Sequence, residues 1–313
     1  MVALAAASGQ NGGAKHREGE SILRRMASIL WSAGEKFVAD DGWAIASYIG
    51  LSLLTSLFPF LIFVAALAGF MGSEELAKEA ARLVFAEWPK EVAGPIAGEV
   101  SNVLTAPRGG LLTLGAILSS YFASSAIEAL RVGLNRAYGL IESRPWWQLR
   151  LQSLFLVLVG SFALLALAFL IVLGPLILGF LEQHAPGLLP AHEFLNFARL
   201  GIAAFMVATS LFLAHWLLPA HRPRLLDLLP GVALTFIASI AFGEAFGAYL
   251  SQFVRNYISM YAGLASVMIA LVYLYWVSLL FVFGGELNAS IMRDRRRHEK
   301  AEQQEQAAAG APE

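Results

Sequence analysis

Charged residues are scarce in this chain, and cysteine is absent. Asp, Glu, Lys and Arg make up 14% of the 313 residues, while hydrophobic residues make up 58%. A soluble domain carries about 25% charged residues, so a soluble fold and bulk intrinsic disorder are both excluded. The formal net charge of −1 argues against a nucleic-acid-binding surface. The absence of cysteine excludes disulfides, thiolate metal sites and thiol nucleophiles.

The few charges leave long apolar intervals between them. These intervals are 42–73, 109–127, 151–181, 200–221, 228–254 (interrupted only by Glu244) and 256–285. A helix needs about 20 mostly apolar residues to cross a bilayer. We therefore predict an all-α polytopic membrane protein with six transmembrane helices, at about 43–71, 109–130, 151–181, 198–218, 228–250 and 262–289.

The basic residues predict an orientation. Most of the 22 Lys and Arg residues fall before the first span, after the last span, or in the second and fourth connections. By the positive-inside rule both termini are cytoplasmic. We expect residues 1–24 to be a disordered N-terminus, 25–292 the membrane domain, and 293–313 a basic, then disordered tail. For residues 73–108 we expect amphipathic helices that lie on the outer interface of the membrane. They serve either as a lid over an outward-facing opening or as a packed cap.

Sequence motifs for catalysis are missing. No loop is large enough for a soluble catalytic domain, and no Gly-rich phosphate loop followed by Lys-Ser or Lys-Thr occurs. The six histidines form no close metal-ligand pair, and Gly-x-Ser-x-Gly is absent. We expect no catalytic residues, no metal and no cofactor, so the chain is not predicted to be an enzyme.

Glu244 is a charge near the middle of the fifth predicted span. A buried charge in hydrocarbon costs a few kcal/mol or more, so it requires an explanation. Ser239, Gly243, Gly247 and Ser251 repeat every four residues beside it and form a ridge that lets another helix approach. We expect Glu244 near that helix interface rather than facing lipid. It is either a pathway group (a proton or cation site, or a substrate contact) or a structural hydrogen-bonding partner.

The second predicted span carries a polar stripe. Ser120, Ser124 and Glu128 are four residues apart and share one helix face. Glu128 is expected to pair with Arg131, and Asn135 follows Arg131 on an adjoining face. The stripe either lines a hydrophilic pathway or forms a seam between helices joined by hydroxyl groups.

A further set of residues in the first and last spans is expected to have structural roles. Pro59 is expected to kink the first span. Gly284 and Gly285 permit close packing in the last span, where we expect Glu286 and Asn288 to be structural. Glu286 is expected to pair with an arginine of the second connection.

Several of these motifs, taken in order, resemble the YihY/virulence factor BrkB family over about residues 25–292. They are Asp40-Asp41-Gly42, Ala46-Ser47-Tyr48, Ser56-Leu57-Phe58-Pro59-Phe60, Asn135-Arg136-Ala137-Tyr138-Gly139, Arg144-Pro145-Trp146 and Gly284-Gly285-Glu286-Leu287-Asn288-Ala289. Ser47 departs from the alanine that is common in the family. The resemblance implies a six-helix protein of the bacterial inner membrane. The family's former label, ribonuclease BN, is regarded as misassigned, and the absence of a metal motif, a soluble active site and a basic surface disfavours nuclease activity here.

Two functions stay open. The first is a transporter or lipid-translocating protein without a nucleotide motor, using Glu244, Glu128, Arg131, Ser120, Ser124 and Asn135 as pathway groups. The alternative is a non-catalytic envelope scaffold, which predicts a closed helical interior. The expected partners are membrane lipids and a small-molecule, ion or lipid substrate, with no nucleic acid. The oligomeric state is left open.

Overall fold

The computed structural model describes residues 24–70, 109–168, 170, 189–261 and 264–309. Within these residues the regular structure is helical, which agrees with the all-α prediction. A helix of residues 24–39, called the N-terminal helix below, comes first. It is followed by α2 (Gly42–Phe70), α5 (Gly109–Ala137), α6 (Trp146–Ala168), α8 (Leu189–Leu217), α9 (Leu225–Tyr261) and α10 (Ala265–Ala309).

Four helical segments are long and apolar enough to cross a membrane. They are Trp146–Leu167, Phe197–Leu217, Leu225–Gln252 and Val267–Lys300. They fall on the third to sixth predicted spans. In the region of the first predicted span, the stretch Gly42–Leu57 of α2 is apolar. Helix α5 lies in the region of the second predicted span. Six membrane crossings therefore stay a prediction, although the helices are those of a membrane protein.

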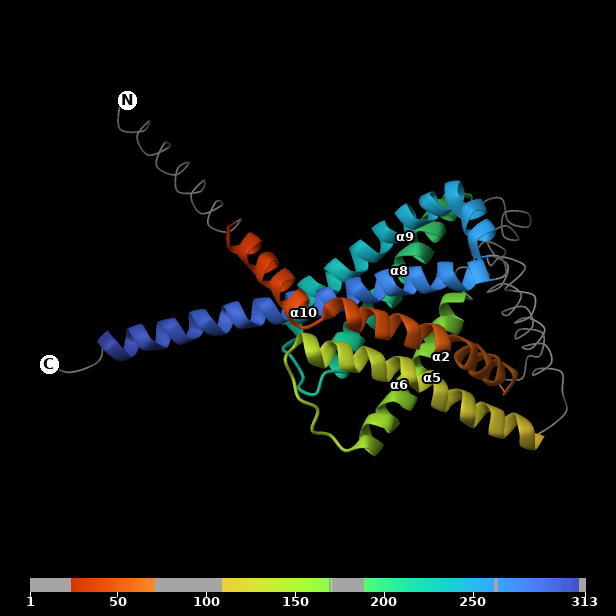
Figure 1. Ribbon diagram of the computed structural model, residues 1–313, viewed down its shortest axis with the longest axis horizontal. Helices are drawn as coiled ribbons and strands as arrows, with labels where there is room; N and C mark the ends of the chain where they lie inside the picture. Colours follow the sequence, from red (N-terminus) through yellow and green to blue (C-terminus); the bar gives the residue numbers. More distant parts are fainter. Residues whose placement is uncertain (1–23, 71–108, 169, 171–188, 262–263, 310–313) are drawn as a thin grey trace, which may run out of the picture.

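The helices form one bundle in which the described termini extend from the same end (Figure 1). Helix α10 packs against α9, α2 and α5. The α5–α6 and α8–α9 connections meet at the terminal end of the bundle, where the Ala220 amide donates to Asn135. We call this end the basic end because of the arginines gathered there. They are Arg24, Arg25, Arg136, Arg144, Arg222, Arg224, Arg293, Arg295, Arg296 and Arg297.

Apolar side chains fill the bundle between α2, α5 and α10. Ile49 of α2, Ala129 of α5 and Val282 of α10 form one buried cluster, which Phe37 of the N-terminal helix completes. The ring of Phe37 contacts Phe283 edge-on, with ring centroids 5.9 Å apart. The N-terminal helix is therefore packed onto the bundle by apolar contact. The ion pair of Arg25 with Asp294 of α10, at 2.7 Å, adds to this contact.

Glycines allow the backbones of α9 and α10 to come into direct contact. A Cβ on Gly231 would collide with the Gly284 carbonyl oxygen, and a Cβ on Gly284 would collide with Thr235 Oγ1. A Cβ on Gly285 would lie 3.1 Å from Leu134 Cδ2 of α5. Both glycines of the predicted motif thus lie at close helix contacts, Gly284 against α9 and Gly285 against α5.

Helix α2 continues through Pro59. Proline cannot donate to the carbonyl four residues earlier. One turn before it, Ser56 is buried and its hydroxyl donates to the Phe122 carbonyl of α5 at 3.2 Å. The Thr55 hydroxyl donates within α2, to the Leu51 carbonyl at 2.9 Å. Hydroxyl groups therefore form both local and interhelical bonds around the proline.

The predicted tail differs from the structure. Residues up to Ala309 belong to α10 rather than to a disordered segment. Alanine, glutamate, glutamine, lysine and arginine dominate this stretch, and all are strong helix formers. Arg295 and Glu299 also form an i,i+4 ion pair at 3.4 Å. Of the predicted disordered N-terminus, Arg24 begins the N-terminal helix; residues 1–23 and the outer loop 73–108 lie outside the described residues.

We predict that Gly284→Ala lowers the apparent Tm of the purified protein in detergent. The added methyl group would collide with Thr235 and Gly231, and overpacking of this kind costs about 1–3 kcal/mol. The matched control is Gly247→Ala in α9, where a Cβ meets nothing within 4 Å. We expect the control to keep or raise the Tm, because alanine is favoured over glycine in a helix by about 1 kcal/mol. An unchanged Tm for Gly284→Ala would contradict the close contact.

Candidate functional site

A cavity of about 440 Å³ lies inside the bundle, and each of the six labelled helices contributes to its lining. The lining includes Leu53 of α2, Leu130 of α5, Gly160 of α6 and Phe281 of α10. Ligand sites in proteins commonly have volumes of about 300–1,000 Å³. The cavity is therefore large enough to hold a ligand.

The cavity lining is apolar. No charged side chain is among the described residues that form it, and its polar groups are the hydroxyls of Ser210, Thr235, Ser239 and Ser278. Ser210, Thr235 and Ser278 each donate to a carbonyl four residues earlier in their own helix. Because its lining is mostly apolar and carries no described charge, the cavity suits an apolar ligand rather than an ion.

The cavity is partly open between α6 and α8. Val159 and Gly160 of α6 and Val207 and Ser210 of α8 line it and are also exposed. The exposed fractions of Val159 and Val207 are 38% and 39%. In a helical membrane protein, a gap in the side of the bundle faces the acyl chains of the bilayer. An apolar molecule could therefore enter from the side.

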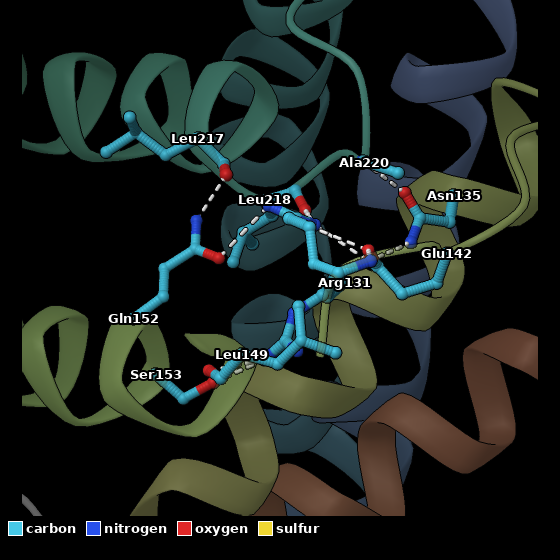
Figure 2. Close-up of polar contacts among 10 residues, drawn as sticks. Arg131, Asn135, Glu142, Leu149, Gln152, Ser153, Leu217, Leu218 and Ala220 are labelled. Atoms are coloured by element: carbon cyan, nitrogen blue, oxygen red, sulfur yellow. Dashed lines mark hydrogen bonds and ion pairs between the residues drawn. The ribbon is translucent and has the colours of Figure 1, made fainter. Parts of the chain in front are cut away.

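A polar network joins α5, α6 and the α8–α9 connection at the basic end of the cavity (Figure 2). Arg144 donates twice to Glu142, at 2.8 and 2.7 Å, in a bidentate pair. The same guanidinium donates to the Leu218 carbonyl at 3.0 Å and to Gln152 Oε1 at 3.2 Å. Because Leu218 also lines the cavity, the network adjoins the cavity directly.

Arg144 also stabilises the ionised form of Glu142, which lies in the α5–α6 connection. The hydrogen bonds from the Arg144 side chain lower the pKa of Glu142 from 4.5 to about 2, with a smaller contribution from Asn135. Asn135 Nδ2 donates to Glu142 at 3.0 Å, while Asn135 Oδ1 accepts from the Ala220 amide at 2.7 Å. Asn135 therefore links the α5–α6 connection to the α8–α9 connection.

Arg131 is buried in the same network. Arg131 is 4% exposed. Its guanidinium donates to the Leu149 carbonyl at 3.3 Å and to the Ser153 hydroxyl. Its Nε has no hydrogen-bond partner, and no ion pair with a described carboxylate is formed. Arg131 is thus a buried cation that relies on neutral acceptors.

The expected Glu128–Arg131 pair is wrong. Glu128 instead accepts from Arg150 of α6 at 2.6 Å, and the same Nη1 donates to Ser124 at 2.7 Å. The Arg150 guanidinium lies 3.6 Å from the centroid of the Tyr121 ring. Arg131 is turned towards Ser153, which leaves Glu128 to a partner from the neighbouring helix. Ser124 and Glu128 therefore lie in a contact between α5 and α6.

The other pathway candidates lie apart from this contact. The Ser120 hydroxyl donates to the Ile117 carbonyl of its own helix at 2.8 Å. Glu244 is exposed, in contrast to the interface expected for it. Phe242 and Phe246 pack on Tyr273 of α10, with ring centroids 5.9 and 5.7 Å away. Glu244 is two residues from each phenylalanine, which in a helix of 3.6 residues per turn places it on the opposite face.

The predicted structural residues of α10 are fully buried. Asn288 Oδ1 accepts from the Gly231 amide at 2.7 Å, and Asn288 Nδ2 donates to the Tyr138 hydroxyl at 3.3 Å. Glu286 is 1% exposed, and the charged side chains near it are Arg293 of the same helix, at 3.8 Å, and Asp40 and Lys36 from the N-terminal part of the chain. The predicted pairing of Glu286 with an arginine of the α5–α6 connection is therefore wrong. Asn288 ties α10 to α9 and to the end of α5.

Sequence reasoning missed Gln152, Ser153 and the cavity residue Gly160. Gln152 Nε2 donates to the Leu217 carbonyl at 2.5 Å, which satisfies the last turn of α8. The available signal was the presence of two polar residues near the start of an apolar span. No comparable signal marks Gly160. The cavity could not be read from the sequence, because it depends on how six helices pack.

The described residues contain no group of three His, Asp or Glu side chains placed to hold a metal ion. His215, which is fully buried, packs against the Phe281 ring with centroids 4.7 Å apart. Its two nitrogens have no hydrogen-bond partner. It therefore occupies an apolar position next to the cavity lining.

Apolar helices of spanning length, a buried interior and interhelical polar contacts define a polytopic helical membrane protein. The chain belongs to the virulence factor BrkB family, whose family model matches residues 33–309. It is 26% identical over 273 residues to the putative ribonuclease-like protein YfkH of Bacillus subtilis (strain 168), covering 86% of this chain and 97% of that protein. It is 25% identical over 281 residues to the UPF0761 membrane protein RC1_0578 of Rhodospirillum centenum (strain ATCC 51521 / SW), covering 86% of this chain and 60% of that protein. No solved structure matches the chain.

We predict that Glu142→Gln lowers the apparent Tm at pH 7 and that this deficit fades on acidification. The pKa of Glu142 is lower in the folded chain than its ordinary 4.5, so the carboxylate stabilises the fold fully above pH 4.5. This contribution is lost as the pH falls towards about 2. Thermal unfolding of wild type and variant in detergent, from pH 7 down to about 2, measures the difference. A deficit that is the same at every pH would contradict the ion pair as its cause.

Proposed function

We propose that this protein translocates membrane lipid, taking an acyl chain into the cavity through the opening between α6 and α8. The observation that carries the proposal is the apolar, partly open cavity lined by all six labelled helices. Apolar surface lined by Leu, Val and Phe side chains favours hydrocarbon, and the described lining carries no charged group that would balance the charge of an ion. A cavity that opens sideways gives access from the bilayer itself.

The described site favours lipid over an ion or a polar solute as the substrate. None of the six predicted pathway residues lines the cavity. Ser124 and Glu128 are engaged with Arg150, and Glu244 lies on an exposed face. A path for ions requires polar groups along its length. The described cavity provides four hydroxyls, and three of these are already bonded within their helices.

The proposal includes an orientation and a mode of movement. The arginine-rich basic end would face the cytoplasm of a bacterial inner membrane, in accordance with the positive-inside rule. Without a nucleotide motor, lipid would move down its own gradient. Lipid translocation of this kind requires no enzymatic reaction of the chain.

The envelope scaffold is the alternative function. It predicts a closed interior, whereas the described bundle contains a partly open cavity of about 440 Å³. The scaffold also predicts that filling this cavity has no functional effect. The next experiment therefore separates the two functions.

We predict that Gly160→Leu slows lipid movement in reconstituted vesicles by about tenfold or more. A Cβ on Gly160 meets nothing within 4 Å, so the helix tolerates a side chain there. The leucine would project into the cavity and occupy volume needed by an acyl chain. The measurement follows a fluorescent phospholipid in vesicles: an impermeant reductant bleaches the outer leaflet at once and the inner-leaflet lipid only as it crosses.

The matched control is Gly247→Leu. Gly247 is also an open helical position, but it lies outside the cavity lining. We expect the control to move lipid at the wild-type rate. Equal rates for wild type, Gly160→Leu and Gly247→Leu would contradict transport through the cavity. Vesicles with wild-type protein that move lipid no faster than empty vesicles would favour the scaffold.

A further inference from the structure

We propose that Arg131 binds the phosphate group of a phospholipid whose acyl chain occupies the cavity. This inference rests on the proposed function and names the chemistry of its substrate. Among the described residues of the α5–α6 region, Arg131 is the arginine without a carboxylate partner, and the inference gives it a role.

The first observation is the balance of charge around Arg131. Arg144 pairs with Glu142 at 2.7 Å, and Arg150 pairs with Glu128 at 2.6 Å. Among the described side chains these two pairs use both neighbouring carboxylates, so Arg131 is left as the excess positive charge. A buried cation is expensive unless it is paired and hydrogen-bonded. The surroundings of Arg131 are therefore complementary to an anion.

The second observation is the incomplete bonding of the guanidinium. Arg131 has five N–H donors, and its described acceptors, the Leu149 carbonyl and the Ser153 hydroxyl, both bond Nη2. Its Nε is buried and has no partner. A phosphate oxygen is an acceptor suited to a guanidinium edge, and charge-assisted bonds of this type are about twice as strong as neutral ones.

The third observation is the position of Arg131 relative to the cavity. Leu130 and Ile127, one and four residues before it on α5, both line the cavity. On α6, Leu156 lines the cavity one helical turn beyond Ser153. Arg131 does not line the cavity itself, and its guanidinium, bonded to Leu149 and Ser153, is separated from the cavity by these lining residues. An apolar space with a cation beside it is the arrangement that an amphiphile requires. A hydrocarbon chain fills the cavity, and a negative headgroup lies beside Arg131.

The experiment measures lipid retained by the purified full-length protein in native mass spectrometry. The probes are dioctanoyl phosphatidylglycerol, dioctanoylglycerol, which has the same chains without phosphate, and inorganic phosphate as a competitor. We expect wild type to bind the phospholipid about ten- to hundredfold more tightly than dioctanoylglycerol, as expected for charged hydrogen bonds. We expect millimolar inorganic phosphate alone not to displace it.

Arg131→Gln should reduce phospholipid binding to the level of dioctanoylglycerol, while dioctanoylglycerol binding stays as in wild type. The matched control is Arg136→Gln on the same helix, whose side chain is 55% exposed and pairs with Asp41 at 3.7 Å. We expect the control to keep the wild-type preference. If Arg131→Gln does not fold, Arg131→Lys serves instead. It keeps the charge but loses the fork-shaped donor set, so we expect it to lose part of the preference.

The outcomes separate the inference from the proposed function. Equal binding of the two lipids by wild type would overturn the phosphate site and leave the cavity proposal standing. Binding of neither lipid would count against the proposed function itself. A wild-type preference retained in Arg131→Gln, or in Arg131→Lys where that variant serves, would assign the phosphate to another group. Displacement by inorganic phosphate alone would show a free-anion site instead of a lipid site.

Discussion

The contact between α9 and α10 at Gly231 and Gly284 is the constraint on which the rest of the bundle depends. No side chain fits between the two backbones there. Asn288 then bonds the Gly231 amide and the Tyr138 hydroxyl, so α5 is fixed to the same point. Further along, Phe242 of α9 stacks on Tyr273 and Trp276 of α10, so the two helices meet there through aromatic rings. A tight crossing at one end and bulky spacers beyond it leave room for the cavity.

Polar groups are concentrated where the helices converge, and the cavity beyond is apolar. Arg144, Gln152 and Asn135 satisfy backbone groups of the α8–α9 connection, which would otherwise lack partners at the end of an apolar helix. Each of these side chains comes from α5, α6 or the connection between them. The network therefore fixes two connections against each other and forms the basic end of the cavity. Buried polar groups of this kind are costly unless bonded, so the network also restricts how the helices can pack.

The all-α class could be predicted from the sequence because a membrane-spanning helix needs a long apolar segment, and each such segment can be recognised without knowledge of its neighbours. Helix α2 begins at Gly42, within a residue of the start of the first predicted span. The structural roles of Gly284 and Asn288 in the last helix could be predicted, but the residues that they contact on other helices could not. Pairing is a property of neighbouring helices, so the sequence spacing that suggested Glu128 with Arg131 missed Arg150. The exposed position of Glu244 likewise depends on which face of α9 the aromatic rings of α10 occupy. The helix propensity of residues 293–309 favours the extension of α10 to Ala309.

The continuity of α10 has a mechanical consequence. The same unbroken helix lines the cavity with Val277 and Phe281, crosses α9 at Gly284 and then runs beyond the bundle to Ala309 (Figure 1). Arg295 is tied to Asp227 at the start of α9, and Asp294 to Arg25, so the exit of the helix from the bundle is clamped on two sides. The stretch from Gly284 to Ala309 measures about 38 Å at about 1.5 Å per residue, so a tilt of about 5° would displace its far end by about 3 Å. A tilt of α10 large enough to change the cavity width would therefore be carried to the far end of the helix, and it would have to break or shift these two ion pairs.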